Sequence, residues 1–421
     1  MLRAITLEGF RCFDDPQQLR LSGLTVFAGA NNVGKSSVVH ALTALVQSEE
    51  QQSRELLRLA GPWVDLGSFR QTLNSARSGQ ERYFRIGLNT LVAGIERDVV
   101  WTFDDPGDSS SDAARLKRVE ALVADTEFEI KLEDDARTYG WSEGGDSTDG
   151  GMKSGRAELP HPGRARLYLD ATRNLDRELQ LLPYGPENVL YLGPHRSPAP
   201  RLHPPRRNFV GPLLGITGEY TAETLLDRER TSWDVLPKHT VAGVPLVLAL
   251  NAWWRHIFEG DYTLKPERVE GLGTRLLLDT PTAENLSLGQ VGTGLSQALP
   301  IVTLGLCSAP GQLVIIESPE IHLHPAAQHR LCDLFVALVR SGRQVIVETH
   351  SDHLVNAIRI AVKNGAAREG LASDQVSINF FSQKDGRTTI DPIPIDESGR
   401  LERWPVGFFD QTAQSLLELM K

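Results

Sequence analysis

One short stretch of the sequence, residues 24–45, constrains the fold more than any other. The apolar run Leu24 to Phe27 is typical of a buried strand, and apolar residues recur at helical spacing over residues 38–45. Between these two segments lies the sequence GANNVGKSS, residues 29–37. Glycines let backbone N–H groups approach phosphate oxygens, and a following helix presents its N-terminal amides to the same anion. The stretch therefore predicts a phosphate-binding loop between a buried strand and a helix.

The residues of this loop have distinct predicted roles. Lys35 supplies a positive charge for the terminal phosphates, and the hydroxyl of Ser36 is a ligand for Mg2+. We expect a bound ATP to contact Gly29, Asn31, Asn32, Gly34, Lys35, Ser36 and Ser37. The alternative is a glycine-rich turn that only caps an ordinary helix.

Length and composition limit the class of protein. A chain of 421 residues exceeds one compact core, so we expect two lobes or an elaborated domain. The net charge of −10 argues against a surface uniformly built for nucleic acid, although a local basic face remains compatible with it. The three cysteines lack the paired spacing of zinc or redox sites, and no apolar stretch reaches the roughly 18 residues of a membrane helix. These features predict a cytoplasmic protein without a membrane segment.

Two further apolar strands end in residues that suit the same site. The run Leu313 to Ile316 is followed by Glu317, an acid in position to hold Mg2+. A second run, residues 345–347, places His350 just past its end, where it can contact the γ-phosphate or an attacking water. The alternatives are an exposed strand-end acid and a structural histidine.

The remaining segments outline the architecture. Residues 2–8 alternate like a strand, and several alternating segments between residues 82 and 170 predict antiparallel hairpins. A helical stretch is expected over residues 220–258. The last part of the chain is predicted to form two strands, 376–381 and 388–395, followed by a terminal helix.

Several segments together resemble a known family. The sequence is similar to the ABC-type ATPases of the RecF, SMC and OLD group, most closely to a prokaryotic subgroup with a PExHLHP Walker B segment. The matching pieces are LEGFRCF (7–13), GANNVGKSS (29–37), VDLGSF (64–69), YLGPHRSP (191–198), VGTGLSQALPIV (291–302), ESPEIHLHP (317–325) and ETHSDHL (348–354). The C-terminal segment resembles the small uncharacterised domain that closes this subgroup.

The resemblance implies an α/β fold. It predicts an ABC-ATPase head with a mixed central sheet flanked by helices, an antiparallel β subdomain and a helical signature lobe. The expected parts are residues 1–110 with the P-loop, 111–310 ending in the signature, 311–370 with Walker B and the H-loop, and a small C-terminal domain at 371–421.

The resemblance also implies a homodimer that encloses ATP, each copy presenting its signature to the other's P-loop. Two registers fit the signature: LSLGQ at 286–290, and the segment 291–297 with Gly292, Gly294 and Ser296. We favour the second because its glycines introduce an apolar helix. A glycine-rich hairpin with a capped helix is the alternative.

The acidic pair departs from the Asp-Glu that many of these ATPases carry. Here it is Glu317-Ser318, and a serine is no general base at neutral pH. Glu320 substitutes if the turn through Pro319 brings it within reach, and His350 positions the water. We therefore predict slow ATP hydrolysis, with Glu317, Glu320 and His350 as catalytic residues.

The function that the resemblance implies is a sensor or regulatory ATPase of a multi-component bacterial system, plausibly anti-phage defence, with a separate nuclease or toxin as effector. The tail after His350 lacks the clustered acids of a Toprim nuclease, so we expect no nuclease within this chain. The alternatives are an ATP-gated scaffold without turnover and a RecF-like DNA-repair ATPase. Arg196, Arg201, Arg206 and Arg207 fit either DNA phosphates, a partner's acids or a solvated loop.

Overall fold

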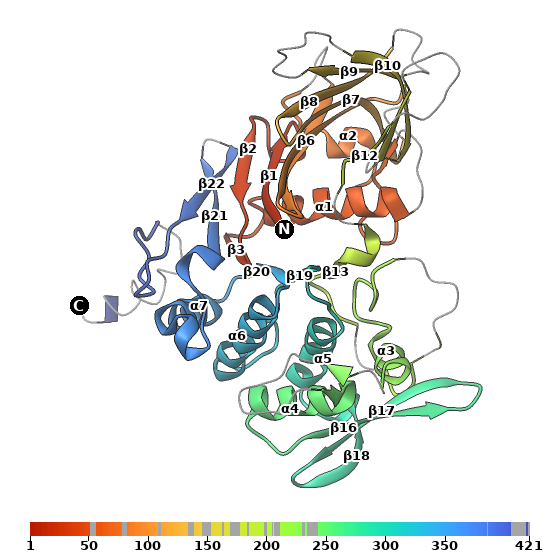
Figure 1. The fold of residues 1–421 in the computed structure, drawn as a ribbon. Helices are drawn as coiled ribbons and strands as arrows, with labels where there is room; N and C mark the ends of the chain where they lie inside the picture. Colours follow the sequence, from red (N-terminus) through yellow and green to blue (C-terminus); the bar gives the residue numbers. More distant parts are fainter. Residues whose placement is uncertain are drawn as a thin grey trace. The chain divides into compact units, whose positions relative to one another are not determined.

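The computed structural model describes residues 1–50, 56–77, 82–107, 111–133, 139–144, 153–161, 164–168, 177–182, 185–197, 200–203, 205, 211–229, 232–233, 243–384, 386–405 and 418–419. The chain divides into two compact units. The first contains Met1–Leu21, Asn32–Asn188 and Phe381–Ile390, and the second contains Ser22–Asn31, Val189–Phe380 and Asp391–Lys421. Figure 1 shows the elements of each unit along the chain.

The first unit is built on an eleven-stranded sheet in the described residues, with the order β12-β11-β10-β9-β8-β7-β6-β5-β1-β2 and β4 beside β7. Its strands are β1 (Leu2–Glu8), β2 (Gln17–Arg20), β4 (Leu56–Arg58), β5 (Tyr83–Val92), β6 (Ile95–Asp104), β7 (Ala113–Val123), β8 (Thr126–Leu132), β9 (Tyr139–Gly144), β10 (Lys153–His161), β11 (Arg164–Tyr168) and β12 (Arg177–Gln180). Within the described residues these strands pair antiparallel, as the alternating sequence segments predict.

Two tight turns set the register of this sheet. Ala93 and Gly94 join β5 to β6 with φ of 51° and 80°, and Ala124 and Asp125 join β7 to β8 with φ of 47° and 66°. Positive φ at both central residues is the geometry of a type I′ turn, whose twist matches that of the paired strands. The meander therefore follows from turn chemistry as well as from strand patterning.

Apolar side chains cover one face of the sheet. The rings of Phe10 and Phe103 each contact Phe84, with centroids 5.4 Å apart in both pairs. The helix α1 (Lys35–Glu50) is tied to β4, because Ser48 Oγ accepts a 2.8 Å hydrogen bond from the Arg58 amide. A short helix, α2 (Phe69–Thr72), and the 3₁₀ turn η1 (Pro186–Asn188) complete the unit.

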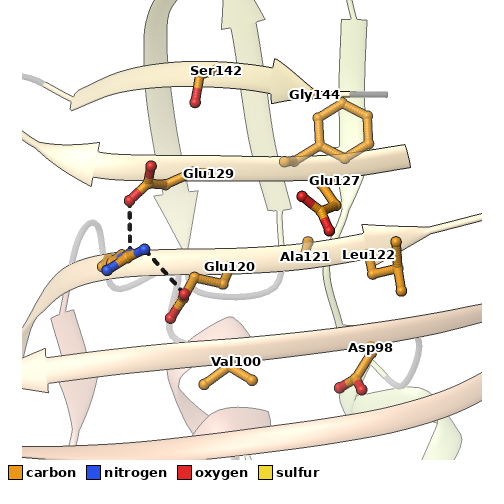
Figure 2. A pocket seen from close by; sticks show the side chains of 11 residues that line it. Asp98, Val100, Glu120, Ala121, Leu122, Glu127, Glu129, Ser142 and Gly144 are labelled. Atoms are coloured by element: carbon orange, nitrogen blue, oxygen red, sulfur yellow. Dashed lines mark ion pairs between the residues drawn. The ribbon is translucent and has the colours of Figure 1, made fainter. Parts of the chain in front are cut away.

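The sheet also carries a hollow lined by residues of β6 to β9, and Figure 2 shows its polar side chains. Arg118 pairs with Glu120 at 3.0 Å and with Glu129 at 2.8 Å. Burial, together with the charge of Glu96, raises the pKa of Asp98 above its ordinary value. The hollow is therefore acidic, with Arg118 neutralising part of its charge.

A six-stranded sheet has the order β13-β19-β20-β3-β21-β22, and its residues belong to the second unit except for the parts of β21 and β22 within Phe381–Ile390. The strands are β13 (Val189–Leu192), β19 (Leu313–Glu317), β20 (Gln344–Glu348), β3 (Leu24–Gly29), β21 (Val376–Lys384) and β22 (Arg387–Ile393). The four strands β13, β19, β20 and β3 run parallel, whereas the short connection between β21 and β22 requires an antiparallel pair. This is the mixed sheet that the family resemblance implies, and its parallel strands are the continuous apolar runs.

Helices cover this sheet. Figure 1 shows α5 (Thr293–Leu306), α6 (Pro325–Arg340) and α7 (Asp352–Asn364) side by side, with α4 (Leu246–Phe258) packed against α5 and α6. The smaller elements are α3 (Thr221–Asp227), β16 (Thr263–Val269), β17 (Gly273–Thr280), β18 (Ala283–Ser287) and the 3₁₀ turns η2 (Leu288–Gln290), η3 (Ala366–Arg368) and η4 (Ser373–Gln375).

The helical stretch expected over residues 220–258 contains α3 and α4, but it is not helical throughout. Two short strands, β14 (Ser232–Trp233) and β15 (Val244–Pro245), pair between α3 and α4. Their two-residue length leaves no alternation for a sequence pattern to reveal. The terminal helix lies mostly outside the described residues, which include only Glu418 and Leu419 of that segment.

Candidate nucleotide-binding site

The segment GANNVGKSS has the predicted strand–loop–helix setting, since β3 ends at Gly29 and α1 begins at Lys35. Asn32 and Gly34 have φ of 61° and 101°, backbone conformations that bend the chain sharply between strand and helix. The Ser37 amide donates to the Gly34 carbonyl at 3.1 Å, which starts the helix. The local fold is thus that of a phosphate-binding loop, and the ligand roles of its side chains stay predictions.

The turn after β1 packs against this loop. A β-carbon on Gly34 would meet Cys12 Sγ, and would lie 3.3 Å from Phe13 Cζ. Phe13 is buried and therefore belongs to the core beneath this turn. Glycine is therefore required at position 34 for space as well as for its positive φ.

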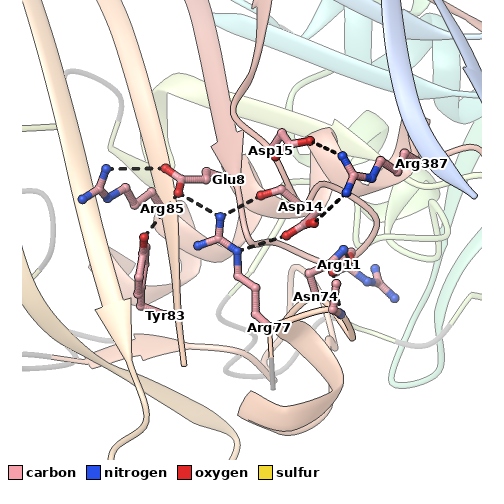
Figure 3. Close-up of polar contacts among 10 residues, drawn as sticks. Glu8, Arg11, Asp14, Asp15, Asn74, Arg77, Tyr83, Arg85 and Arg387 are labelled. Atoms are coloured by element: carbon pink, nitrogen blue, oxygen red, sulfur yellow. Dashed lines mark hydrogen bonds and ion pairs between the residues drawn. The ribbon is translucent and has the colours of Figure 1, made fainter. Parts of the chain in front are cut away.

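A polar network fixes the backbone of the same turn, and Figure 3 shows its members. Arg11 has φ of 51°, and its carbonyl accepts a 2.6 Å hydrogen bond from Asn74 Nδ2. Arg77 holds the turn from outside, donating to Glu8 Oε1 at 2.9 Å and to the Asp14 carbonyl at 2.8 Å. The turn that contains the left-handed residue Arg11 is therefore held by hydrogen bonds at Arg11 itself and at Glu8 and Asp14 on either side of it.

The side chain of Arg11 is held by His40 of α1, with 2.9 Å between Arg11 Nη1 and His40 Nδ1. Burial and the nearby charge of Arg11 lower the pKa of His40 to about 4. The ring is therefore neutral at physiological pH and accepts a hydrogen bond from the guanidinium at Nδ1.

The acid Glu317 lies at the carboxyl end of β19. Its register partner on β20 is Glu348, and Glu348 is opposite Phe27 of β3. Glu317 and the start of the phosphate-binding loop at Gly29 consequently lie at the same edge of the sheet, where ligands of parallel sheets bind.

Tyr191 of β13 orients this acid. Its hydroxyl donates a 2.6 Å hydrogen bond to Glu317 Oε1, and both side chains are buried. Burial and the charge of Glu317 raise the pKa of Tyr191, so the phenol stays protonated and remains a donor. A buried carboxylate needs such a donor, because an unsatisfied charge in the interior is costly.

The turn after Glu317 brings Glu320 to the end of β20. Ser318 has φ of 46°, and its amide donates to the Glu348 carbonyl at 2.7 Å. Glu320 Oε1 accepts a 2.6 Å hydrogen bond from the His350 amide. The other oxygen, Oε2, is buried and has no hydrogen-bond partner among the described residues. The turn through Pro319 therefore places Glu320 beside His350.

Arg196 belongs to the same cluster. Its guanidinium donates to the Glu317 carbonyl at 2.6 Å and to the Ser318 carbonyl at 2.9 Å. Arg196 is only 8% exposed, which contradicts the interpretation of this residue as part of a solvated loop or a DNA contact. Arg201 is exposed, and Arg206 and Arg207 lie outside the described residues.

The roles of Tyr191 and Arg196 were not predicted from the sequence, although both residues belong to the segment YLGPHRSP. The available signal was a tyrosine at the end of an apolar strand, followed within a few residues by an arginine. Neither residue is close in sequence to Glu317, so the contact depends on the pairing of β13 with β19.

The signature segment forms the start of α5. Gly292 precedes the helix, Gly294 lies in its first turn, and Ser296 Oγ donates to the Thr293 carbonyl at 2.9 Å. In the other register, Ser287 and Gln290 close a small capping arrangement around η2, with the Ser287 amide donating to Gln290 Oε1 at 2.9 Å. Only the register 291–297 therefore coincides with the N-terminus of a long helix.

Gly294 also touches the loop that follows Walker B. A β-carbon there would lie 2.6 Å from the His322 carbonyl oxygen. His322 and His324 are exposed, and the described residues contain no group of three or more His, Cys, Asp or Glu side chains suited to a metal. His324 instead caps α6, where its Nδ1 accepts from the Ala326 amide at 3.3 Å.

Gln71, just after the matching segment VDLGSF, has a local structural contact. Gln71 Oε1 accepts from the Ser68 amide at 2.8 Å, so this side chain caps the short helix α2. Within the described residues, none of the helices has both the length and the apolar character needed to span a membrane.

Comparison with known proteins places these features in a family. Residues 24–356 match the family described as "AAA domain, putative AbiEii toxin, Type IV TA system", and residues 371–419 match a family described as "Protein of unknown function (DUF3696)". The chain is 23% identical over 403 residues to an OLD nuclease of Thermus scotoductus, covering 91% of this chain and 65% of that protein. It is 35% identical over 71 residues to the Old nuclease of Escherichia phage P2, covering 15% of this chain and 12% of that protein.

Solved structures similar to this chain include SMC head domains. One is the SMC head domain from Thermotoga maritima, with a TM-score of 0.43, 12% identity, and coverage of 94% of this chain and 99% of that chain. Another is an SmcHead bound to the C-winged helix domain of ScpA, with a TM-score of 0.47, 15% identity, and coverage of 94% and 98%. Because the first family match includes the P-loop, the segment 291–297 and Glu317, and covers most of the chain, the chain belongs to this AAA-domain family.

Proposed function

We propose that this protein binds ATP with Mg2+ and hydrolyses it slowly, in a dimer that closes around the nucleotide. The observation that carries the proposal is the shared edge of β3, β19 and β20. The phosphate-binding loop begins there at Gly29, and Glu317 and His350 stand at the ends of the two neighbouring strands. This arrangement supports a nucleotide triphosphate as ligand.

The residues of the chain fit a magnesium ion. The carboxylate of Glu317 and the hydroxyl of Ser36 are hard oxygen ligands of the kind that Mg2+ prefers. Tyr191 orients Glu317 through the 2.6 Å hydrogen bond to Oε1. When bound, the ion neutralises charge on the phosphate oxygens.

Glu320 is the proposed general base. One carboxylate oxygen is fixed by the His350 amide, and the buried Oε2 has no partner among the described residues. A buried acceptor without a partner is costly, and the O–H of an attacking water would satisfy it. Glu320 would accept the proton of that water, while Ser318 contributes no base.

Slow turnover is expected because Glu320 takes the place of the glutamate that is missing at position 318. Glu320 acts from three residues beyond the metal ligand, on a turn whose geometry depends on several other hydrogen bonds. A base placed less directly than the glutamate of an Asp-Glu pair lowers the rate of hydrolysis more than the affinity for ATP.

The exposed start of α5 is the proposed dimer contact. Gly292, Thr293 and His322 are exposed, and they lie together because Gly294 packs on the His322 carbonyl. A second copy would present Gly292, Gly294 and Ser296 to the phosphates of a nucleotide held by the first copy. ATP would then bridge the two copies.

The broader role is a sensor or regulatory subunit of a multi-component bacterial system, with a separate nuclease or toxin as effector. The family description, which mentions a toxin, and the similarity to OLD nucleases both support a defence role. The chain spans 65% of the length of the Thermus nuclease, so the activity of that whole protein is part of the proposal only.

Steady-state assays on purified protein test the nucleotide chemistry. We expect Lys35→Ala to lose ATP binding, and Glu320→Gln to bind ATP, form dimers and lose turnover. The matched control is Glu397→Gln, which changes an exposed glutamate and should behave as the wild type. ATP binding and dimerisation without any wild-type turnover would favour the ATP-gated scaffold. Full turnover in Glu320→Gln would remove Glu320 from the mechanism.

Association experiments test the broader role. Co-purification of a nuclease or toxin encoded beside this gene, dependent on ATP and lost in Lys35→Ala, is the expected result. Salt-sensitive DNA binding without such a partner would favour a RecF-like repair role instead.

A further inference from the structure

We propose that Arg196 is the positioning residue that holds Glu320 in place for hydrolysis. This inference rests on the proposed function, and it assigns a role to a residue outside the P-loop, Walker B and signature segments. Arg196 follows β13 in a loop, yet its guanidinium reaches the main chain at the end of β19.

The contact matches the shape of a guanidinium. Arg196 Nη2 donates to the Glu317 carbonyl at 2.6 Å, and Nη1 donates to the Ser318 carbonyl at 2.9 Å and to the Pro194 carbonyl at 3.0 Å. The two adjacent carbonyls of the Walker B turn are therefore fixed by one planar, forked group. Lysine has a single ammonium and cannot reproduce this geometry.

The charge of Arg196 is retained although the side chain is buried. Burial lowers the pKa of Arg196 to about 10, while the nearby carboxylates of Glu320 and Glu317 oppose this change. The guanidinium is consequently protonated at neutral pH. Burying a cation to 8% exposure costs desolvation free energy, which specific partners must offset. Here the partners are the carbonyls of Glu317 and Ser318 and the carboxylates of Glu317 and Glu320.

The hydrogen bonds act where the backbone is strained. Ser318 has φ of 46°, a conformation that a serine seldom adopts and that the surrounding structure must impose. With its carbonyl held by Arg196 and its amide bound to the Glu348 carbonyl, the peptide groups on both sides of Ser318 are fixed. The direction of the chain toward Glu320 follows from these two contacts.

The far end of the turn is held separately. Gln328 of α6 donates to the Leu323 carbonyl at 2.8 Å, and Ser351 Oγ donates to Gln328 Oε1 at 2.6 Å. Between these anchors, the His350 amide holds Glu320 Oε1 at 2.6 Å. Removal of Arg196 therefore releases the start of the turn while the end remains tied to α6 and α7.

The test uses Arg196→Met and Arg196→Lys in the full chain, with Arg201→Met as the matched control, since Arg201 is exposed in the same segment. Amide hydrogen exchange, measured without nucleotide, reports the position of Glu320 directly. We expect the His350 amide to exchange at least ten-fold faster in both Arg196 variants, with exchange in the middle of β19 and β20 unchanged. Unchanged exchange at His350, or an equal increase throughout the sheet, would overturn the proposal.

Kinetics supply the second readout. We expect both Arg196 variants to lose ten-fold or more in kcat while the Kd for ATP changes less than three-fold. Combining Arg196→Met with Glu320→Gln should give no further loss of kcat, because both changes remove the same positioned base. Additive losses, or equal losses of affinity and kcat, would overturn the positioning role. If the wild type shows no turnover, the proposed hydrolysis fails, and the exchange experiment alone decides the role of Arg196.

Discussion

The sulfur of Cys12 occupies the space that a β-carbon on Gly34 would need. Cys12 Sγ also lies 3.9 Å from Ser37 Oγ, so the turn after β1 contacts both the phosphate-binding loop and the first turn of α1. The shape of the loop is therefore set by a segment that precedes it in the chain, as well as by its own glycines.

Gly34→Ala is expected to weaken ATP binding by at least ten-fold. The added carbon collides with Cys12, and φ of 101° at this position disfavours any residue with a β-carbon. Titration with a fluorescent ATP analogue measures the change. Adding Cys12→Ala should restore only part of the affinity, because it removes the collision and leaves the backbone strain. Wild-type affinity in Gly34→Ala would contradict the described loop geometry.

Gly294→Ala and Gly292→Ala form a matched pair within the signature segment. A β-carbon on Gly294 would lie 2.6 Å from the His322 carbonyl oxygen, whereas one on Gly292 meets nothing within 4 Å. We expect Gly294→Ala to lower the free energy of unfolding by about 1–3 kcal/mol and Gly292→Ala to leave it nearly unchanged. Denaturant unfolding checks both values, and equal effects of the two changes would argue against this packing.

The parts of the fold that sequence predicted are those carried by local patterns. The strands β3, β19 and β20 are largely apolar runs. The sequence from Gly29 to Lys35 is specific to phosphate-binding loops. The hairpins of the first unit have alternating strands and short turns. Each of these signals lies within about ten residues, which is the range over which periodicity acts.

The parts that sequence did not predict depend on long-range pairing. The hydrogen bonds from Tyr191 and Arg196 to Glu317 join residues more than a hundred positions apart, and they exist because β13 pairs with β19. The sequence around Arg196 was equally compatible with an exposed side chain, because a buried charge can be predicted only when its partners are known. The roles of the phosphate-binding loop and of the signature segment in binding ATP stay predictions.

His40 is expected to make stability depend on pH. Its pKa is about 4 in the folded protein, against an ordinary value of 6.5. Above pH 6.5 the ring is neutral in both states. As the pH falls from 6.5 toward 4, the unfolded chain takes up the proton first, so the folded state loses up to about 3 kcal/mol. The unfolding free energy of His40→Gln, which keeps an acceptor for Arg11, should lack this component.

Measurements of unfolding at pH 7 and pH 4.5 separate this effect from that of the other titrating groups. At pH 4.5 the free energy of unfolding of the wild type is expected to fall relative to that of His40→Gln. A difference that stays constant between the two pH values would show that His40 titrates normally and that its contact with Arg11 does not hold the ring neutral.

Tyr191→Phe tests the support of the metal ligand. The change removes the hydroxyl that donates to Glu317 Oε1 at 2.6 Å and keeps the buried ring. A buried carboxylate that loses a donor costs about 1–3 kcal/mol, so the free energy of unfolding should fall by that amount. The carboxylate of Glu317 should also lose its fixed orientation, which raises the Mg2+ concentration needed for ATP hydrolysis.

The expected Mg2+ dependence distinguishes this effect from simple loss of packing. Because Tyr191→Phe keeps the buried ring and removes only the donor to Glu317, its rate of ATP hydrolysis should fall more at limiting Mg2+ than at saturating Mg2+. Tyr220→Phe, which removes a partly buried hydroxyl outside this site, is the control. A Mg2+ requirement that is identical in wild type and Tyr191→Phe would mean that the Tyr191 hydrogen bond does not orient Glu317 for the metal.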